Sequence, residues 1–223
     1  MNKRKKLSLV FILAAGLTLP LAGTPTANAT DNANMTMSQN QQKPYTDIVT
    51  WGDSIAYGTG QAGRVGKKYN RGRVSASHWG GISYPVLGTL KPDTLVLISA
   101  GINDFNTIKG RDNGKTMLPK YETWLEQELK TIMAKGGKPV LILAKLDRPY
   151  RASSIAFAEK MAQTQIKVCE RLGVAYLRQG PMYRDGLHPK SYKALYDRLI
   201  EKADSFYSVE KQSRAAPKPP KPL

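Results

Sequence analysis

The sequence is poor in the residues on which disulfide frameworks and metal clusters depend. Its 223 residues include one Cys and two His. A single Cys excludes an internal disulfide framework and a Cys-rich zinc site. Two His leave almost no room for a histidine metal cluster. Any catalytic histidine must therefore be His78 or His188.

Acidic residues are also scarce, with 17 Asp and Glu against 34 Lys and Arg and a formal net charge of +17. The composition is otherwise typical of a globular protein, with 41% hydrophobic and 23% charged residues. An excess of positive charge suits a nucleic acid, an anionic glycan, a lipid headgroup or a cell-wall surface as the partner. It can equally serve only to keep the protein in solution.

The first 29 residues have the three parts of a secretory signal peptide. A basic segment at 2–6 precedes an apolar run from Leu7 to Leu21, and Ala27 and Ala29 fit an A-x-A cleavage pattern. The apolar run of about 15 residues is shorter than the ~20 that a membrane-spanning helix needs. We expect a secreted or periplasmic protein, cleaved near Ala29 and without a transmembrane anchor in the mature chain. Export argues against nucleic acid as a partner.

Composition divides the rest of the chain into three parts. Residues 30–43 are rich in Asn, Gln, Thr and Met and are expected to form a flexible leader. Residues 44–208 form the expected globular domain, which we expect to be a monomer. Residues 209–223 end in a basic Pro-rich tail, for which a polyproline-type conformation is expected.

Uninterrupted apolar runs alternate with helical patterns through the domain. Such runs suit strands that are buried on both faces of a parallel sheet. Four runs predict strands, and a weaker fifth is expected at 73–75; the four lie at 47–51, 93–100, 138–146 and 173–177. Apolar residues at three- and four-residue steps predict helices over 117–133, 153–172 and 191–207. This order predicts an α/β three-layer sandwich around a five-stranded parallel sheet, as in flavodoxin-like folds.

Three polar segments follow strands or precede the last helix, where catalytic groups gather in such a sheet. Ser54 comes after the first strand and Gly52, and could instead merely cap the following helix. Asn103, after the strongest strand, could donate a hydrogen bond to an oxyanion or belong to a plain Asn-Asp turn. Asp185 and His188 are three residues apart, so the carboxylate can accept the His Nδ1–H and leave Nε2 free as a base.

Together these segments resemble the motifs of the SGNH (GDSL-type) hydrolase family. The resemblance covers about residues 47–207, through Gly52-Asp53-Ser54, Gly101-Ile102-Asn103-Asp104 and Asp185-Gly186-Leu187-His188-Pro189. It implies the SGNH fold, with Ser54 as the nucleophile, His188 as the base and Asp185 as the residue that orients His188. It also implies that Asn103 and the backbone N–H of Ser54 donate to the oxyanion. No metal and no organic cofactor are implied.

The family's second motif usually supplies a further backbone donor from a Gly. Here the best placement puts Ser75 at that position, followed by Ala76, and neither residue is Gly. A backbone donor does not require Gly, but a positive φ would strain a residue that carries a side chain. This departure leaves open a non-catalytic, glycan-binding protein on the same fold.

The segment between the first and second motifs is strongly basic. It holds five Lys or Arg residues, namely Arg64, Lys67, Lys68, Arg71 and Arg73. We expect this loop near the site, where Arg71 and Arg73 would receive an anionic substrate, although it could be only a solvated loop. Trp79 could stack on a sugar ring, or it could belong to the core.

The resemblance implies a serine esterase that forms an acyl-enzyme. Export and the basic loop favour hydrolysis of small acyl groups, acetyl above all, on a cell-envelope or extracellular polysaccharide that carries anionic groups. A lipid esterase or lysophospholipase and a thioesterase remain alternatives. The motifs do not separate a hydrolase from the family's acyltransferase relatives.

Overall fold

Five parallel strands form the centre of the protein. The computed structural model describes residues 43–80 and 82–215. The strands lie in the order β2-β1-β3-β4-β5, and their bounds are β1 (Ile48–Gly52), β2 (Asn70–Gly72), β3 (Thr94–Ser99), β4 (Gly137–Leu143) and β5 (Ala175–Arg178). Every pairing is parallel. The predicted α/β fold with a five-stranded parallel sheet is confirmed.

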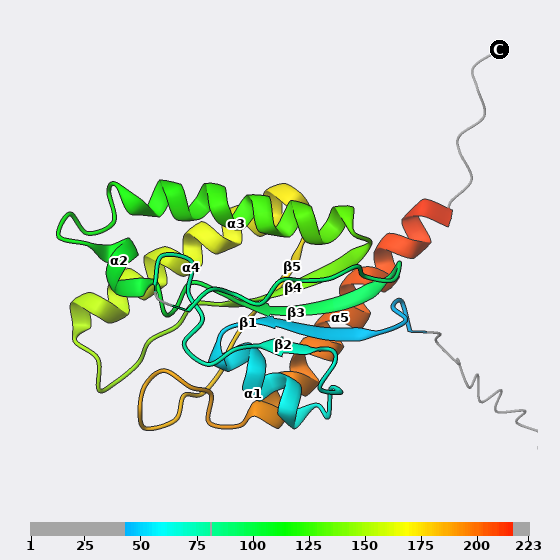
Figure 1. Ribbon diagram of the computed structural model, residues 1–223, viewed down its shortest axis with the longest axis horizontal. Helices are drawn as coiled ribbons and strands as arrows, with labels where there is room; N and C mark the ends of the chain where they lie inside the picture. Colours follow the sequence, from blue (N-terminus) through cyan, green and yellow to red (C-terminus); the bar gives the residue numbers. More distant parts are fainter. Residues whose placement is uncertain (1–42, 81, 216–223) are drawn as a thin grey trace, which may run out of the picture. The chain divides into compact units, whose positions relative to one another are not determined.

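Helices cover both faces of this sheet (Figure 1). They are α1 (Ser54–Ala62), α2 (Phe105–Lys109), α3 (Met117–Ala134), α4 (Ala152–Leu172) and α5 (Tyr192–Ala215). The pair α1 and α5 packs together on one face, and α3 and α4 pack together on the other. These three layers are the expected sandwich. The last helix continues to Ala215, eight residues past the end that its apolar pattern predicts.

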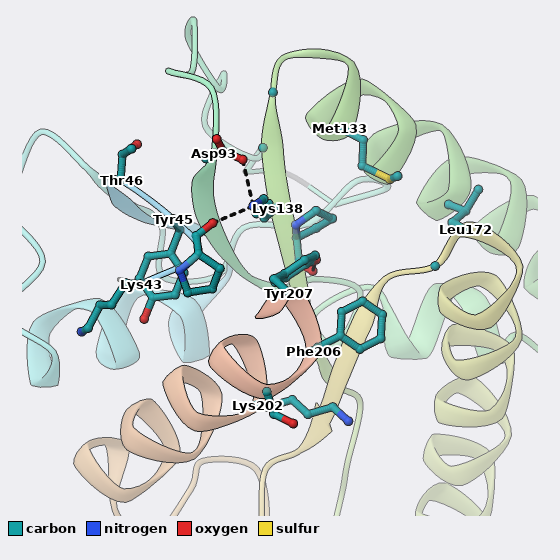
Figure 2. Close-up of a pocket in the computed structure, with 16 residues that line it drawn as sticks. Lys43, Tyr45, Thr46, Asp93, Met133, Lys138, Leu172, Lys202, Phe206 and Tyr207 are labelled. Carbon is teal, nitrogen blue, oxygen red and sulfur yellow. Dashed lines mark hydrogen bonds and ion pairs between the residues drawn. The ribbon is translucent and has the colours of Figure 1, made fainter. Parts of the chain in front are cut away.

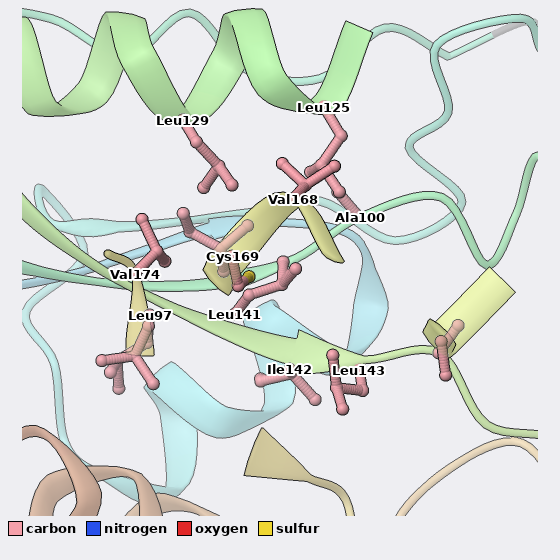
Figure 3. Packing of buried hydrophobic residues seen from close by; sticks show 14 of the residues in the cluster. Leu97, Ala100, Leu125, Leu129, Leu141, Ile142, Leu143, Val168, Cys169 and Val174 are labelled. Carbon is pink, nitrogen blue, oxygen red and sulfur yellow. The ribbon is translucent and has the colours of Figure 1, made fainter. Parts of the chain in front are cut away.

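The core lies between the sheet and its helices. All six residues of β3 are buried, as its continuous apolar run predicts. Leu125 and Leu129 of α3 project toward the sheet, and Cys169 of α4 packs beside Leu141 of β4 (Figure 3). Burial raises the pKa of the Cys169 thiol to about 12. Cys169 is therefore a small core residue without the thiolate that reactivity requires.

The fifth strand lies three residues earlier than the sequence predicts. It comprises Asn70–Gly72 at the edge of the sheet, and not 73–75. The Thr50 hydroxyl of β1 donates to the Asn70 side chain at 2.7 Å, which anchors this short strand. A Cβ at Gly72 would lie 2.1 Å from the backbone nitrogen of Tyr57, so α1 approaches β2 more closely than any other residue type would permit. Ser75 then turns the chain away with a φ of 60°.

The expected segments at the two ends of the chain are described only in part. The signal peptide (1–29) lies outside the described residues, as do all but the last residue of the leader and residues 216–223 of the tail. No helix among residues 43–80 and 82–215 is both long and apolar enough to cross a membrane.

Candidate active site

Ser54 is the first residue of α1 and follows β1 through a tight turn. Gly52 has a φ of 130°, and a Cβ there would lie 1.8 Å from the carbonyl oxygen of Ser99 on β3. Only Gly can occupy such a position. Asp53 caps the helix, because its Oδ1 accepts the backbone N–H of Ile55 at 2.9 Å. The turn thus leaves Ser54 partly exposed at the carboxyl end of the sheet.

The structure brings Ser54 together with its two expected partners, His188 and Asp185, which are more than a hundred residues later in the sequence. The Ser54 Oγ lies 3.2 Å from the Nε2 of His188. The Nδ1 of His188 lies 2.8 Å from the Oδ2 of Asp185. When Nδ1–H donates to Asp185, Nε2 is free to accept the Ser54 proton. This is the arrangement of a nucleophile, a base and the group that orients the base.

A tight turn between β5 and α5 holds Asp185 and His188. The Oδ1 of Asp185 accepts the backbone N–H groups of Leu187 at 2.9 Å and His188 at 3.0 Å. The N–H of Tyr183 also donates to the His188 carbonyl at 2.7 Å. Partial burial acts to raise the pKa of Asp185, but hydrogen bonds from His188 and Leu187 outweigh it and lower the pKa to about 2. The carboxylate is therefore ionised from mildly acidic pH upward.

Asn103 lies at the same end of the sheet, just after β3. Its side chain is exposed, and its Nδ2 donates to the carbonyl oxygen of Ala76 at 3.0 Å. Ala76 directly follows Ser75, so this bond joins the second and third motif segments. An amide nitrogen has two hydrogens. One holds the neighbouring loop, and the other remains available to a ligand.

Ser75 adopts the left-handed backbone conformation that favours Gly, with a φ of 60°. Such a conformation costs about 1–2 kcal/mol in a residue with a side chain. Within residues 43–80 and 82–215, no acceptor takes the backbone N–H of Ser75. The N–H of Ser54 lacks an acceptor within its helix because Ser54 is in the first turn of α1. Both backbone donors can therefore bind a ligand.

The sequence motifs indicate only a turn at Asp104, but its contacts in the structure make it a further functional candidate. Its side chain is 1% exposed. The Oδ1 accepts the backbone N–H of Trp79 and the Oδ2 that of His78, each at 2.8 Å. Burial raises the pKa of Asp104, against the lowering effect of these two hydrogen bonds. Asp104 thus ties the loop after Ser75 to the segment that carries Asn103.

Trp79 belongs to an aromatic cluster beside this loop. Its ring lies 5.9 Å from that of Trp124 on α3 and 4.5 Å from that of His78, measured between centroids. The His78 ring stacks on Trp124 at 4.7 Å. Trp79 is only partly buried, so part of its surface can still contact a ligand. His78 packs in this cluster and is not the base that lies against Ser54.

The expected position of the basic loop is wrong for three of its five residues. Because β2 runs parallel to β1, the loop before it must lie at the amino end of the sheet. Arg64 lies beside Ile48 at the start of β1, with Lys67 and Lys68 following it. Helix α1 has carried the chain roughly 13 Å away from Ser54 by this point. Arg73 does lie at the carboxyl end, where its N–H donates to the Gly52 carbonyl at 2.9 Å.

A cavity of about 1010 Å³ also lies at the end of the sheet opposite to Ser54 (Figure 2). Residues that precede or begin the strands line it, among them Tyr45, Asp93 and Lys138. The Lys138 ammonium donates to the Pro44 carbonyl at 2.6 Å and pairs with Asp93 at 2.8 Å. This cavity is therefore separate from the group around Ser54. Among the described residues, no three His, Cys, Asp or Glu side chains gather as a metal site requires.

Comparison with known proteins identifies the fold. No protein-family model and no curated protein matches the chain. A solved member of the carbohydrate acetylesterase family and a solved carbohydrate acetylesterase, both from Sinorhizobium meliloti, are 13% and 14% identical to this chain in the aligned part, with TM-scores of 0.54 and 0.50. Each alignment covers 73% of this chain and 99% of the other. A member of the lipolytic protein G-D-S-L family from Veillonella parvula is 16% identical over 75% of this chain and 98% of its own, with a TM-score of 0.45. The likeness to the two structures with TM-scores of 0.54 and 0.50 confirms the predicted fold.

Proposed function

We propose that this protein is an exported serine esterase in which Ser54 is the nucleophile, His188 the base and Asp185 the residue that orients the base. The contact of Ser54 Oγ with His188 Nε2 at 3.2 Å, backed by Asp185 at 2.8 Å, carries the proposal. A helix-capping role for Ser54 would not require a histidine at this distance. A serine hydroxyl needs such a base to become a useful nucleophile.

In the proposed reaction, the Ser54 Oγ bonds to the ester carbonyl carbon while His188 Nε2 takes the hydroxyl proton. The carbonyl oxygen becomes an oxyanion, and the N–H groups of Ser54 and Ser75 and the amide of Asn103 donate to it. When the ester C–O bond breaks, His188 returns the proton to the leaving alcohol. Water then attacks the acyl-enzyme with the same proton transfers, which releases the acid and restores Ser54. Each step is complete without a metal or an organic cofactor.

The conformation of Ser75 supports the proposed oxyanion site. Backbone strain persists where the surrounding structure enforces it, and it gathers at functional sites. Here Ser75 has a φ of 60°, and its backbone N–H has no acceptor among the residues that the structure describes. The same departure from Gly is the reason to test a non-catalytic, glycan-binding protein beside the esterase.

The proposed substrate is a small acyl ester, above all an acetyl ester, on a cell-envelope or extracellular polysaccharide. The signal-peptide pattern of residues 1–29 supports an extracellular or periplasmic location. Two of the solved structures with this fold are carbohydrate acetylesterases. The partly exposed Ser54 and exposed Asn103 also suit an acyl group presented by a large polymer.

The test compares wild type with Ser54→Ala on an aryl acetate. Loss of nearly all turnover in the variant, with the fold retained by circular dichroism, is the expected result. Equal rates for the two proteins would reject Ser54 as the nucleophile. If neither protein turns over any ester but both bind polysaccharide, the glycan-binding alternative replaces the esterase.

A further inference from the structure

Two loops meet at the carboxyl end of the sheet, beside the turn that holds Asp185 and His188, which we call the catalytic turn. The loop after β4 reaches the loop after β5, where the N–H of Asp147 donates to the carbonyl of Gly186 at 2.8 Å. A Cβ on Gly186 would lie 2.3 Å from the carbonyl oxygen of Asp147 and 2.4 Å from that of Arg148. Because Gly186 lies between Asp185 and His188, residues 147–148 are immediate neighbours of the proposed catalytic group.

These loops carry three exposed arginines, Arg148, Arg151 and Arg184. Among the described residues, none of the three has a carboxylate oxygen within ion-pair distance. The nearby Asp185 is already bonded to His188. Asp147 accepts the backbone N–H of Arg148 at 2.8 Å but forms no ion pair with its guanidinium. Asp147 and Asp185 offset part of the positive charge of these loops, but none of the three guanidinium groups is held in an ion pair within the described part of the protein.

Two arginines outside these loops form ion pairs. Arg171 at the end of α4 bridges Glu122 and Glu126 of α3, at 3.1 and 2.6 Å. Arg178 at the end of β5 contacts Glu159 through two hydrogen bonds of 2.7 Å each. The three arginines of the loops lack such a partner among the described residues, as do Arg64, Arg71, Arg73, Arg111 and Arg198. What distinguishes the three is their position in the loops beside Asp185 and His188.

Exposed aromatic rings accompany the unpaired arginines. Tyr150 is 38% exposed and Tyr183 is 48% exposed. The guanidinium carbon of Arg184 lies 5.5 Å from the centroid of the Tyr183 ring, which holds the arginine and leaves its N–H donors free. A guanidinium donates two parallel hydrogen bonds to a carboxylate or a sulfate. Flat tyrosine rings offer an amphipathic surface to a sugar.

We propose that Arg148, Arg151 and Arg184 form a subsite for the anionic groups of a polysaccharide whose ester lies at Ser54. This inference rests on the proposed esterase and names its substrate class, an acylated polymer with carboxylate or sulfate groups along its chain. Arg73, on the opposite side of Ser54 beside Gly52, extends the positive edge along such a polymer. A polymer is favoured over a lipid because the large exposed hydrophobic residues beside these three arginines are tyrosines, Tyr150 and Tyr183, whose rings also carry a polar hydroxyl.

The test measures kcat/KM on acetylated polygalacturonate, which is anionic, on acetylated xylan, which is neutral, and on an aryl acetate. The subsite variant replaces Arg148, Arg151 and Arg184 with Gln. The matched control replaces Arg64, Lys67 and Lys68 with Gln, which removes the same charge at the opposite end of the sheet. We expect the ratio of polygalacturonate to aryl-acetate kcat/KM to fall about tenfold in the subsite variant, because each exposed ion pair is weak and three of them are lost together.

The control variant should keep the wild-type ratio, and the xylan to aryl-acetate ratio should not change in either variant. Salt at about 0.5 M should reduce the difference in polygalacturonate kcat/KM between wild type and the subsite variant, because exposed charges are then screened over a few ångströms. Equal losses in the two variants, or an unchanged ratio in the subsite variant, would overturn the proposed subsite while leaving the esterase intact.

A second measurement separates this inference from the esterase itself. In the Ser54→Ala background, affinity electrophoresis in polygalacturonate should retard the protein, and the three Gln substitutions at the subsite should remove the retardation. Sulfated galactan in place of polygalacturonate tells whether carboxylate or sulfate is preferred. If the Ser54→Ala protein is retarded but the Ser54-containing protein turns over no ester, the esterase is rejected and the subsite is kept. If the Ser54→Ala protein is not retarded, the subsite is rejected.

Discussion

The amide nitrogen of Asn103 donates a hydrogen bond of 3.0 Å to the carbonyl oxygen of Ala76. This bond fixes the rotation of the amide and directs its second hydrogen away from Ala76. It also links the chain after β3 to the residue that follows Ser75. A preorganised donor of this kind stabilises an oxyanion without any reorganisation during the reaction.

Replacing Asn103 with Ala should lower kcat on an aryl acetate by about 10²–10³-fold, the usual effect of removing one oxyanion donor. KM should change little, because the donor acts mainly in the transition state. Steady-state kinetics provide the measurement. Asn106→Ala, at an exposed position on the neighbouring helix α2, is the control and should retain wild-type rates. A full-rate Asn103→Ala enzyme would remove Asn103 from the oxyanion site.

Asp185→Asn should reduce turnover by about 10³–10⁴-fold, because Asn can donate to Nδ1 and so stabilise the wrong His188 tautomer. The Asp185 pKa of about 2 means that its carboxylate stays ionised where the enzyme is expected to work. The acid limb of a pH–rate profile should therefore not report the ionisation of Asp185. His78→Ala should retain most of the activity. Loss of activity in His78→Ala but not in His188→Ala would contradict the assignment of the base.

Asp104→Asn should reduce both stability and turnover. The Asp104 carboxylate accepts two backbone N–H groups in a buried position, whereas Asn offers one acceptor and would turn an amide N–H₂ toward a donor. One unsatisfied buried donor costs about 1–3 kcal/mol in the free energy of unfolding. Urea denaturation provides the measurement. Asp112 also accepts two backbone N–H groups, but in a partly exposed turn, so Asp112→Asn should cost less.

Asp53 should make the stability of the protein depend on pH. Burial raises its pKa from 3.8 to about 7, although Ser99 and the backbone N–H groups of Ile55 and Ala56 act to lower it. The folded state therefore holds this proton more tightly than the unfolded chain. The corresponding stability is fully present below pH 3.8 and is lost as the pH rises toward about 7.

Asp53→Asn stays uncharged over this range and should not lose that stability. The difference in unfolding free energy between wild type and Asp53→Asn should change by up to about 1.4 kcal/mol per pH unit. Urea denaturation at a series of pH values gives this difference. Hydrogen bonds from Thr116 lower the pKa of Asp112, so its contribution to stability is present above pH 3.8 and is lost as the pH falls further. The Asp112→Asn difference should therefore change little between pH 3.8 and 7, and should change with the opposite sign only below that range. If the difference in unfolding free energy between wild type and Asp53→Asn does not change with pH, Asp53 is ionised without cost in the folded protein.

Local patterns in the sequence are sufficient for much of this fold. Runs such as Thr94–Ser99 suit a strand buried on both faces, and the structure places one there. Gly173 ends α4 with a φ of 65°, a left-handed conformation that is common after a helix and that Gly adopts readily. The spacing of Asp185 and His188 also predicts their contact, because three residues on one turn bring the two side chains within reach.

Tertiary structure decided what depends on strand direction and on contacts between distant segments. The basic residues 64–68 are close to Ser54 in sequence, but a short parallel edge strand places them at the opposite end of the sheet. Arg148 precedes Gly186 by 38 residues, yet the meeting of two loops brings it beside the turn that holds Asp185 and His188. Hydrogen bonds from the backbone N–H groups of His78 and Trp79 to the buried Asp104 carboxylate join two segments that are distant in sequence. Local sequence determines which residues turn, extend or coil, whereas strand order and packing determine which of them meet.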